Sequence, residues 1–339
     1  MNRQHPQPLR ILMSQPSMAQ LGEAVAEIMG AQPYELMALD AAVASNRTDA
    51  DVAFISREVT GASTKHEIHP ALQQVYDLLS QSPGLQWVHI HSAGADRQIY
   101  LDLRARGVQI ATSSGANAQV VATMALAGLL ALARRFPMLW AEQQAQQWIP
   151  MLGERMPRDL PGQTATIVGW GPIGQKLSSL LQALGLNVVA VRQQAGPQTP
   201  LQADAVERVT FEQLQQVLPR TDWLILACPL TDKTRQLVNA HALAALPKGA
   251  HLINVARGEV VDQSALVAAL QSGHLGGAFL DVFQHEPLQR DSPLWAMPQV
   301  MVTPHAAGHS DGNEKRVSQM FLDNLRRFAS GQPLHQVVR

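Results

Sequence analysis

Three side chains suited to acid–base chemistry follow apolar runs in the second half of the sequence. Arg257 follows HLINVA, Glu286 comes shortly after GGAFL, and His305 follows VMVT. Arginine stays charged and binds carboxylates through its planar fork, whereas histidine exchanges protons near neutral pH. A neighbouring carboxylate favours the protonated histidine and fixes its tautomer. Together with a hydride donor, this set could reduce a 2-oxo acid, with the histidine protonating the forming alkoxide.

A glycine-rich turn, GWGPIG, lies between a strand-like run and an amphipathic pattern typical of a helix. In a βαβ unit spanning residues 164–193, Gly169 would allow the tight turn and Gly171 would let the backbone approach a pyrophosphate. Gly174 would let the helix pack closely on the strand. The N-terminus of that helix favours negative charge. The spacing therefore predicts a site for a dinucleotide.

The second strand of this unit, 188–191, ends at Arg192 instead of an acidic residue. A carboxylate there would bind the ribose 2′-hydroxyl of NAD and repel a 2′-phosphate, whereas arginine can pair with that phosphate. We therefore expect NADP(H) to be preferred, with NAD(H) as the second choice. The alternative is that Arg192 is an ordinary solvated loop residue.

The composition favours a small-molecule partner. The 339 residues suit two domains, and a formal net charge of −1 argues against nucleic acid or an anionic membrane surface as a partner. The longest apolar run, 120–133, is too short for a membrane span, and the N-terminus carries no secretory signal pattern. The single cysteine, Cys228, excludes an internal disulfide and fits the cytoplasm. No metal site is expected.

Strand-like and helix-like patterns alternate along the chain, which predicts an α/β protein with two doubly wound parallel sheets. Residues 1–113, completed by a C-terminal helix in 310–339, are expected to form a flavodoxin-like substrate domain. Residues 114–309 are expected to form a Rossmann dinucleotide-binding domain with six strands. Because ligands bind at the carboxyl ends of the strands in such sheets, the polar residues that follow the strands should share one edge with the glycine turn.

Several longer motifs, in order, resemble those of the D-isomer-specific 2-hydroxyacid dehydrogenases. They are SAGAD at 92–96, the GWGPIG turn, CPLTDKTRQLVN at 228–239, HLINVARGEVVDQSALVAAL, FLDVFQHEPLQRDSPLW and VTPHAAG. The series covers nearly the whole chain, and within that family it is similar to the glyoxylate/hydroxypyruvate reductase branch. The resemblance implies NAD(P)H-dependent reduction of small 2-oxo acids to D-2-hydroxy acids.

The resemblance also implies a role for each residue of these motifs. Arg257 would bind the substrate carboxylate and carbonyl, His305 would be the general acid and base, and Glu286 would pair with His305. The loop Ser92, Ala93 and Gly94 would hold the substrate carboxylate, and Asp281 the nicotinamide carboxamide. Further cofactor contacts are implied for the following residues: Gly169, Gly171, Pro172, Ile173, Gly174, Cys228, Pro229, Leu230, Val255 and Ala256.

The apolar helix expected over 117–135 would form the core of a homodimer. The family usually has an acidic residue soon after the start of this helix, and Ala122-Thr123 stands there instead. We expect this departure to alter local packing or the dimer contact. Trp140 and Trp148 are candidates either for a wall of the partner subunit's pocket or for the core of the dimer interface.

Two other functions stay open. One is the same reaction on a bulkier 2-oxo acid such as phenylpyruvate, which the size of the pocket would decide. The other is a corepressor-like protein that senses the dinucleotide without catalysis, because a fold by itself does not fix a function. The presence of Arg257, Glu286 and His305 favours an enzyme.

Overall fold

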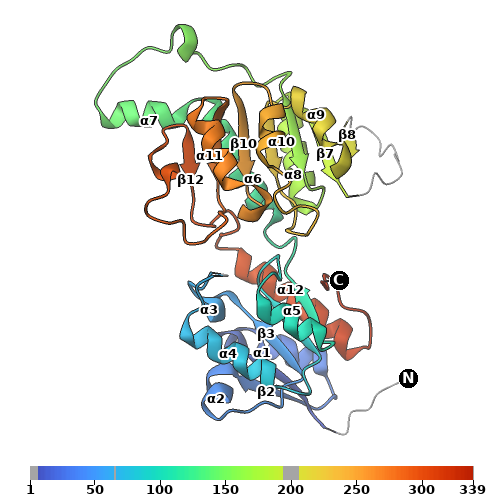
Figure 1. The fold of residues 1–339 in the computed structure, drawn as a ribbon. Coiled ribbons are helices and arrows are strands. Elements are labelled where there is room, and N and C mark those ends of the chain that lie inside the picture. Colours follow the sequence, from blue (N-terminus) through green and yellow to red (C-terminus); the bar gives the residue numbers. More distant parts are fainter. Residues whose placement is uncertain (1–6, 65, 194–205, 339) are drawn as a thin grey trace. The chain divides into compact units, whose positions relative to one another are not determined.

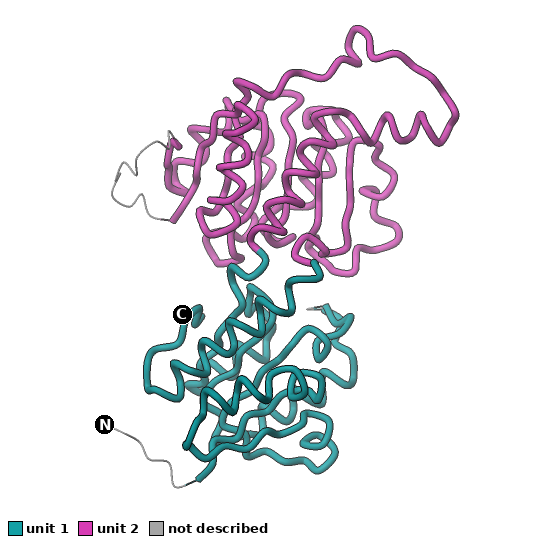
Figure 2. Tube along the Cα trace, turned by 180° about the vertical axis from the view of Figure 1, so that it is seen from behind, with its two compact units in different colours: residues 1–117, 310–339 teal, residues 118–309 magenta. Residues whose placement is uncertain are grey.

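The computed structural model describes residues 7–64, 66–193 and 206–338. The chain forms two compact units (Figure 2). Unit 1 comprises residues 1–117 and 310–339, and unit 2 comprises residues 118–309. Both units are α/β structures built on parallel sheets, as the sequence predicts.

Unit 1 contains a five-stranded sheet in the order β2-β1-β3-β4-β5, which is the flavodoxin-like order (Figure 1). Its strands are β1 (Leu9–Met13), β2 (Tyr34–Ala38), β3 (Val52–Ile55), β4 (Trp87–Ile90) and β5 (Gln109–Thr112). Its helices are α1 (Gln15–Met29), α2 (Leu39–Ala44), α3 (Arg57–Thr60), α4 (Pro70–Gln81), α5 (Gln98–Ala105) and α12 (Asn313–Ala329).

Alternating side chains of the strands fill two cores, one on each face of this sheet. Ile11 and Met13 pack against α1 and α12, whereas Leu12 packs against the side covered by α4 and α5. On the first face, Phe321 of α12 stacks on Phe54 of β3 with ring centroids 4.5 Å apart. The last helix of the chain therefore completes the core of unit 1.

Unit 2 contains a seven-stranded sheet in the order β12-β11-β10-β9-β6-β7-β8. Its strands are β6 (Thr164–Val168), β7 (Asn187–Arg192), β8 (Glu207–Thr210), β9 (Trp223–Leu226), β10 (Ala250–Asn254), β11 (Leu275–Leu280) and β12 (Val300–Val302). Its α-helices are α6 (Ala118–Ala133), α7 (Phe136–Gln144), α8 (Pro172–Ala183), α9 (Leu214–Val217), α10 (Ala240–Ala245) and α11 (Gln263–Gln271). The strand order reverses between β6 and β9, which is the usual place for a nucleotide in such sheets.

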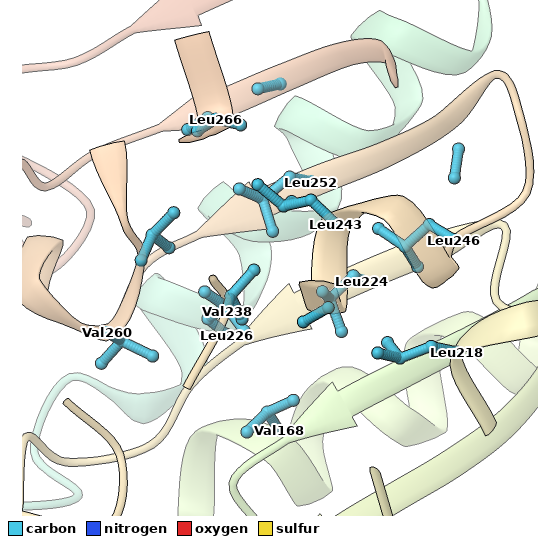
Figure 3. Close-up of a cluster of buried hydrophobic side chains, with 14 of the residues drawn as sticks. Val168, Leu218, Leu224, Leu226, Val238, Leu243, Leu246, Leu252, Val260 and Leu266 are labelled. Atoms are coloured by element: carbon cyan, nitrogen blue, oxygen red, sulfur yellow. The ribbon is translucent and has the colours of Figure 1, made fainter. Parts of the chain in front are cut away.

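Alternation of side chains again separates two cores. Val168, Leu224 and Leu252 belong to the cluster beneath α9, α10 and α11, part of which Figure 3 shows. Ile167 and Ile225, their neighbours in sequence, belong to the cluster beneath α6 and α8. A sheet buried on both faces requires such nearly continuous apolar runs, and these runs made the central strands predictable.

The sequence predicted six strands in the dinucleotide-binding domain, whereas the sheet of unit 2 has seven. The additional strand, β8, lies at the edge of the sheet, and Val209 is its only buried residue. A short edge strand with one buried side chain carries no periodic apolar signal, so the sequence pattern did not reveal it.

Helix α6 lies against β10 and β11 and against α8. A Cβ on Gly128 would stand 2.4 Å from the ring of Phe279, so the small residue permits this close packing. After α7 the chain leaves the body of unit 2 as a long loop before it returns to β6 (Figure 1). Within the described part of the chain, no single helix is both long enough and apolar enough to span a membrane. Of the described helices, only α6 and α7 taken together have that length and apolar character, and a 67° bend separates them.

Candidate active site

Three neighbouring strands bring the predicted acid–base residues to one edge of unit 2. Arg257 follows β10, Glu286 lies in the loop after β11, and His305 lies in the loop after β12. The loops are tied together by backbone hydrogen bonds from Asp281 N to Asn254 O at 3.0 Å and from His305 N to Asp281 O at 2.8 Å. The parallel register of β10, β11 and β12 thus positions all three side chains.

His305 and Glu286 form a hydrogen-bonded pair. Nδ1 of His305 lies 2.8 Å from Oε2 of Glu286, and the other carboxylate oxygen accepts from Phe283 N at 3.1 Å. Burial favours the neutral form of Glu286, but the hydrogen bonds from His305 and Phe283 N, together with the charges of His305 and Arg257, outweigh it, so the pKa of Glu286 lies below its ordinary value. The side chain of His305 is 50% exposed, against 14% for Glu286. An ionised, shielded carboxylate therefore orients an accessible imidazole.

Asp281 organises the loop that carries His305. Its Oδ1 accepts from Thr303 Oγ1 at 2.6 Å and from Ala306 N at 2.7 Å, and its Oδ2 accepts from Ala307 N at 3.0 Å. These three hydrogen bonds tie the end of β11 to the loop that follows β12. Three contacts to one loop explain why this acidic residue is buried at 2% exposure.

Arg257 is the N-cap of a one-turn 3-10 helix, Gly258–Val260. Its Nη1 donates a hydrogen bond to Ala256 O over 2.8 Å. A Cβ on Gly258 would lie 1.8 Å from the backbone carbon of Phe283, so this glycine lets the Arg257 turn touch the loop that leads to Glu286. The positive charge of Arg257 stabilises the ionised carboxylate of Glu286 and so contributes to its lowered pKa.

Asn254, at the end of β10, is a residue that the sequence analysis missed. Its Oδ1 accepts from Ala256 N at 3.0 Å, and its Nδ2 donates to Arg257 O over 3.1 Å, so the amide fixes the backbone on both sides of the turn. Asn254 is 1% exposed. A polar residue directly after the apolar pair Leu252-Ile253 at the end of the strand was the available signal, because a buried amide requires partners.

The glycine turn has the close packing that a dinucleotide site requires. A Cβ on Gly174 would lie 2.1 Å from Gly169 O, and Gly169 itself has φ of +111°. No atom of the described residues lies within 4 Å of a Cβ built on Gly171, so its backbone is open to a ligand. Gly171 is the N-cap of α8, and Pro172 and Ile173 form the first turn. The open backbone and the helix N-terminus fit a pyrophosphate.

The other predicted cofactor residues follow β9 and β10 at the same edge. Cys228, Pro229 and Leu230 come after β9, next to the glycine turn, since a Cβ on Gly169 would touch Cys228 N at 2.7 Å. Burial raises the pKa of Cys228 to about 12, although the Arg257 charge opposes it, so this thiol is no nucleophile. Val255 and Ala256 are buried between β10 and Arg257.

The predicted substrate loop of Ser92, Ala93 and Gly94 belongs to unit 1, at the carboxyl end of β4. Ser92 Oγ donates to Gly94 O over 2.8 Å, and Ser92 O accepts from Ser113 N at 3.0 Å. The loop is thus held in shape by contacts within unit 1. Within the described ranges, no group of three or more histidine, cysteine, aspartate or glutamate residues could hold a metal ion.

Comparison with known proteins agrees with this geometry. The family model for the NAD binding domain of D-isomer specific 2-hydroxyacid dehydrogenases matches residues 126–307. The (S)-sulfolactate dehydrogenase of Chromohalobacter salexigens is 35% identical over 251 residues, which cover 74% of this chain and 80% of that protein. A glyoxylate/hydroxypyruvate reductase of Arabidopsis thaliana is 30% identical over 78% of this chain and 79% of its own length.

A solved structure shows the same architecture. The D-isomer specific 2-hydroxyacid dehydrogenase from Xanthobacter autotrophicus Py2, determined in complex with NADPH and MES, is 28% identical and has a TM-score of 0.73. The match covers 98% of each chain. The sheet order, the glycine turn and the matched relatives together place this chain in the D-isomer-specific 2-hydroxyacid dehydrogenase family, as a dehydrogenase with a nicotinamide dinucleotide cofactor.

Proposed function

We propose that this protein reduces small 2-oxo acids, hydroxypyruvate to D-glycerate and glyoxylate to glycolate, with NADPH as the preferred reductant. The observation that carries the proposal is the pairing of an accessible imidazole, His305, with a shielded carboxylate, Glu286, at the strand edge that also bears Arg257. Relatives named glyoxylate reductase and glyoxylate/hydroxypyruvate reductase support it.

The side chains act as follows in this proposal. Arg257 binds the substrate carboxylate and polarises the C2 carbonyl. The protonated imidazole of His305 gives its proton to the alkoxide that forms at C2, and Glu286 stabilises the imidazolium before the transfer. His305 regains a proton from solvent after the product leaves. Bound NADPH supplies the hydride. We also propose that Ser92, Ala93 and Gly94, in the loop after β4, bind a substrate carboxylate.

The cofactor is held by unit 2. The open backbone at Gly171 and the N-terminus of α8 bind the pyrophosphate, and Asp281 accepts from the nicotinamide carboxamide. Arg192, at the end of β7, pairs with the 2′-phosphate and gives the preference for NADP(H) over NAD(H). The remaining contacts come from Gly169, Pro172, Ile173, Gly174, Cys228, Pro229, Leu230, Val255 and Ala256.

We also propose a cytoplasmic homodimer. The segment that follows α6 presents large apolar side chains to solvent, including Phe136 at 57%, Trp140 at 64% and Trp148 at 96% exposure. Exposed apolar residues gathered on one segment are typical of a surface that a partner covers. Light scattering coupled to size exclusion is expected to give twice the mass of one chain.

The substrate is tested by initial rates with glyoxylate, hydroxypyruvate, phenylpyruvate and 3-sulfopyruvate, each with NADPH and with NADH. The sulfonated acid is included because one relative acts on sulfolactate. The proposal requires the two small acids with NADPH to give the highest kcat/KM. A higher kcat/KM for phenylpyruvate or 3-sulfopyruvate would support the same reaction but show that the proposed substrates are wrong. If the protein bound NADPH but did not oxidise it with any of the four 2-oxo acids, the result would indicate a non-catalytic sensor.

A further inference from the structure

Two arginines on adjacent strands share one face of the unit 2 sheet. Arg192 ends β7 and is paired in register with Thr210, whereas Arg208 of β8 is paired with Ala190. Paired residues of neighbouring strands point to the same side, as do alternate residues of one strand. Ala190 is also paired with Ile167, whose side chain lies in the core beneath α8. Arg192 and Arg208 therefore project on the side where the glycine turn leads into α8.

The guanidinium of Arg208 lies over the ring of Trp170, with Cζ 5.9 Å from the ring centroid. Trp170 stands between Gly169 and Gly171 in the glycine turn. A planar guanidinium stacks well on an indole, and the contact fixes the head group without using its N–H donors. The turn that fits a pyrophosphate thus also supports a cation from the edge strand.

Neither arginine has a counter-ion in the described part of the chain. No carboxylate of these residues lies within salt-bridge distance of Arg192 or Arg208. Glu207, which precedes Arg208, is paired with Arg220 at 2.5 Å. Glu212, further along, accepts from its own backbone and from Thr210, and these hydrogen bonds lower its pKa.

Arg208 also lowers the stability of the folded protein at its position in β8. Its Nε is buried and has no hydrogen-bond partner among the described residues. An unpaired buried donor costs free energy, so such a group calls for an explanation other than packing. Binding of a ligand by the two Nη atoms of the guanidinium would explain why an arginine stands there. Two arginines on the sheet face of the glycine turn, one of them held by Trp170, match a phosphomonoester, which carries close to two negative charges at neutral pH.

We propose that Arg208, positioned by Trp170, is a second binding residue for the 2′-phosphate of NADPH, in addition to Arg192. The inference rests on the proposed NADPH preference and extends it to the edge strand. Arg192 gives the preference for the phosphorylated dinucleotide, and a second arginine strengthens it with further charge-assisted hydrogen bonds to the 2′-phosphate. Discrimination between the cofactors then depends on β8 as well as on the end of β7.

The test measures binding of adenosine 2′,5′-bisphosphate and of 5′-AMP to the full chain by titration calorimetry. These ligands differ only in the 2′-phosphate, and neither takes part in the reaction. Arg208→Gln is expected to weaken binding of the bisphosphate about tenfold, the usual effect of losing a hydrogen bond to a charged group. Binding of 5′-AMP should change less than about twofold. Trp170→Leu should give a smaller loss in the same direction, because the cation remains and its support is removed.

Arg220→Gln is the matched control, since it removes a surface arginine that is paired with Glu207 of the same strand. It should leave the ratio of the two affinities unchanged. If Arg208→Gln fails to fold, Arg208→Lys and Trp170→Phe carry the test: lysine should lose part of the bisphosphate affinity, and phenylalanine should keep most of it.

An unchanged affinity ratio in Arg208→Gln would overturn this inference and leave the proposed function intact. An equal loss for both ligands would also overturn it, because that result indicates a structural role. If the wild-type protein itself did not distinguish the two ligands, both this inference and the NADPH preference would be wrong. Reduction of a 2-oxo acid with NADH would still be tested separately by the rate panel.

Discussion

Oε2 of Glu286 accepts a hydrogen bond from Nδ1 of His305 over 2.8 Å. Because the pKa of Glu286 is below its ordinary value, the carboxylate is ionised at neutral pH and the hydrogen resides on Nδ1. Nε2 is thereby left as the nitrogen that exchanges a proton with a substrate. The pair converts an exposed histidine into a directional proton donor.

Replacing His305 by Gln should lower kcat by about 10²- to 10⁴-fold, since a positioned general acid contributes on that order. The affinity for NADPH, measured by fluorescence titration, should stay within about twofold of the wild type because the glutamine removes no proposed cofactor contact. His241→Gln, on the exposed surface of α10, is the control and should turn over normally. Full turnover by the His305 variant would exclude it as the acid.

Replacing Glu286 by Gln keeps the size of the side chain and removes its charge. The neutral amide stabilises the imidazolium less, so kcat should fall about ten- to a hundredfold while KM for the 2-oxo acid changes little. Steady-state kinetics at neutral pH measures both constants. A loss confined to KM would instead assign Glu286 to substrate binding.

Replacing Arg192 by Asp should reverse the cofactor preference. The carboxylate repels the 2′-phosphate of NADPH and can bind the 2′-hydroxyl of NADH. The ratio of kcat/KM for NADPH to that for NADH is expected to fall by at least about a hundredfold, because an attractive contact becomes a repulsive one. An unaltered ratio would show that Arg192 is an ordinary solvated residue.

Two helical glycines give a matched comparison of packing. A Cβ on Gly174 of α8 would lie 2.1 Å from Gly169 O, whereas one on Gly22 of α1 has only Leu36 Cδ1 nearby, at 3.9 Å. Gly174→Ala should therefore destabilise unit 2 by about 2 kcal/mol or more and weaken NADPH binding. Gly22→Ala should stabilise the protein by about 0.5–1 kcal/mol. Urea unfolding measures both, and equal effects would contradict the packing at the glycine turn.

Acid should weaken both units through buried histidines. Burial lowers the pKa of His89 to about 3, and burial together with the Arg135 charge lowers that of His251 to about 4. Well above pH 6.5 neither histidine is charged in the folded or the unfolded chain, and their contribution to stability is complete. As the pH falls below about 6.5, the unfolded chain takes up protons that the folded chain does not, so stability is lost.

Each histidine should cost about 1 kcal/mol between pH 6 and pH 5. In that interval the carboxylates whose pKa is lowered, such as Glu58 and Glu286, stay ionised and contribute little. His89→Asn should remove the dependence from unit 1 and His251→Asn from unit 2, as measured by urea unfolding at the two pH values. Variants that retain the wild-type acid sensitivity would show that other groups cause it.

The sequence predicted those features that depend on buried, continuous patterns. The apolar runs that end at Val168, Asn254 and Leu280 lie in the middle of the sheet, so the edge that bears the glycine turn and His305 followed from their order. Features set by packing between distant segments were not predictable. The support of the Arg257 turn by Asn254 and the stacking of Arg208 on Trp170 depend on the registers of β10 and β8, and β8 itself has too few buried residues to be recognised.

The most direct test of the central claim is the fate of the hydride. The protein is mixed with hydroxypyruvate and NADPH in which both hydrogens at C4 of the nicotinamide are replaced by deuterium, and the product is examined by mass spectrometry and chiral chromatography. The account predicts D-glycerate with deuterium at C2, formed by the wild-type protein and nearly absent with His305→Gln. Unlabelled product, the L-isomer, or equal formation by both proteins would contradict it.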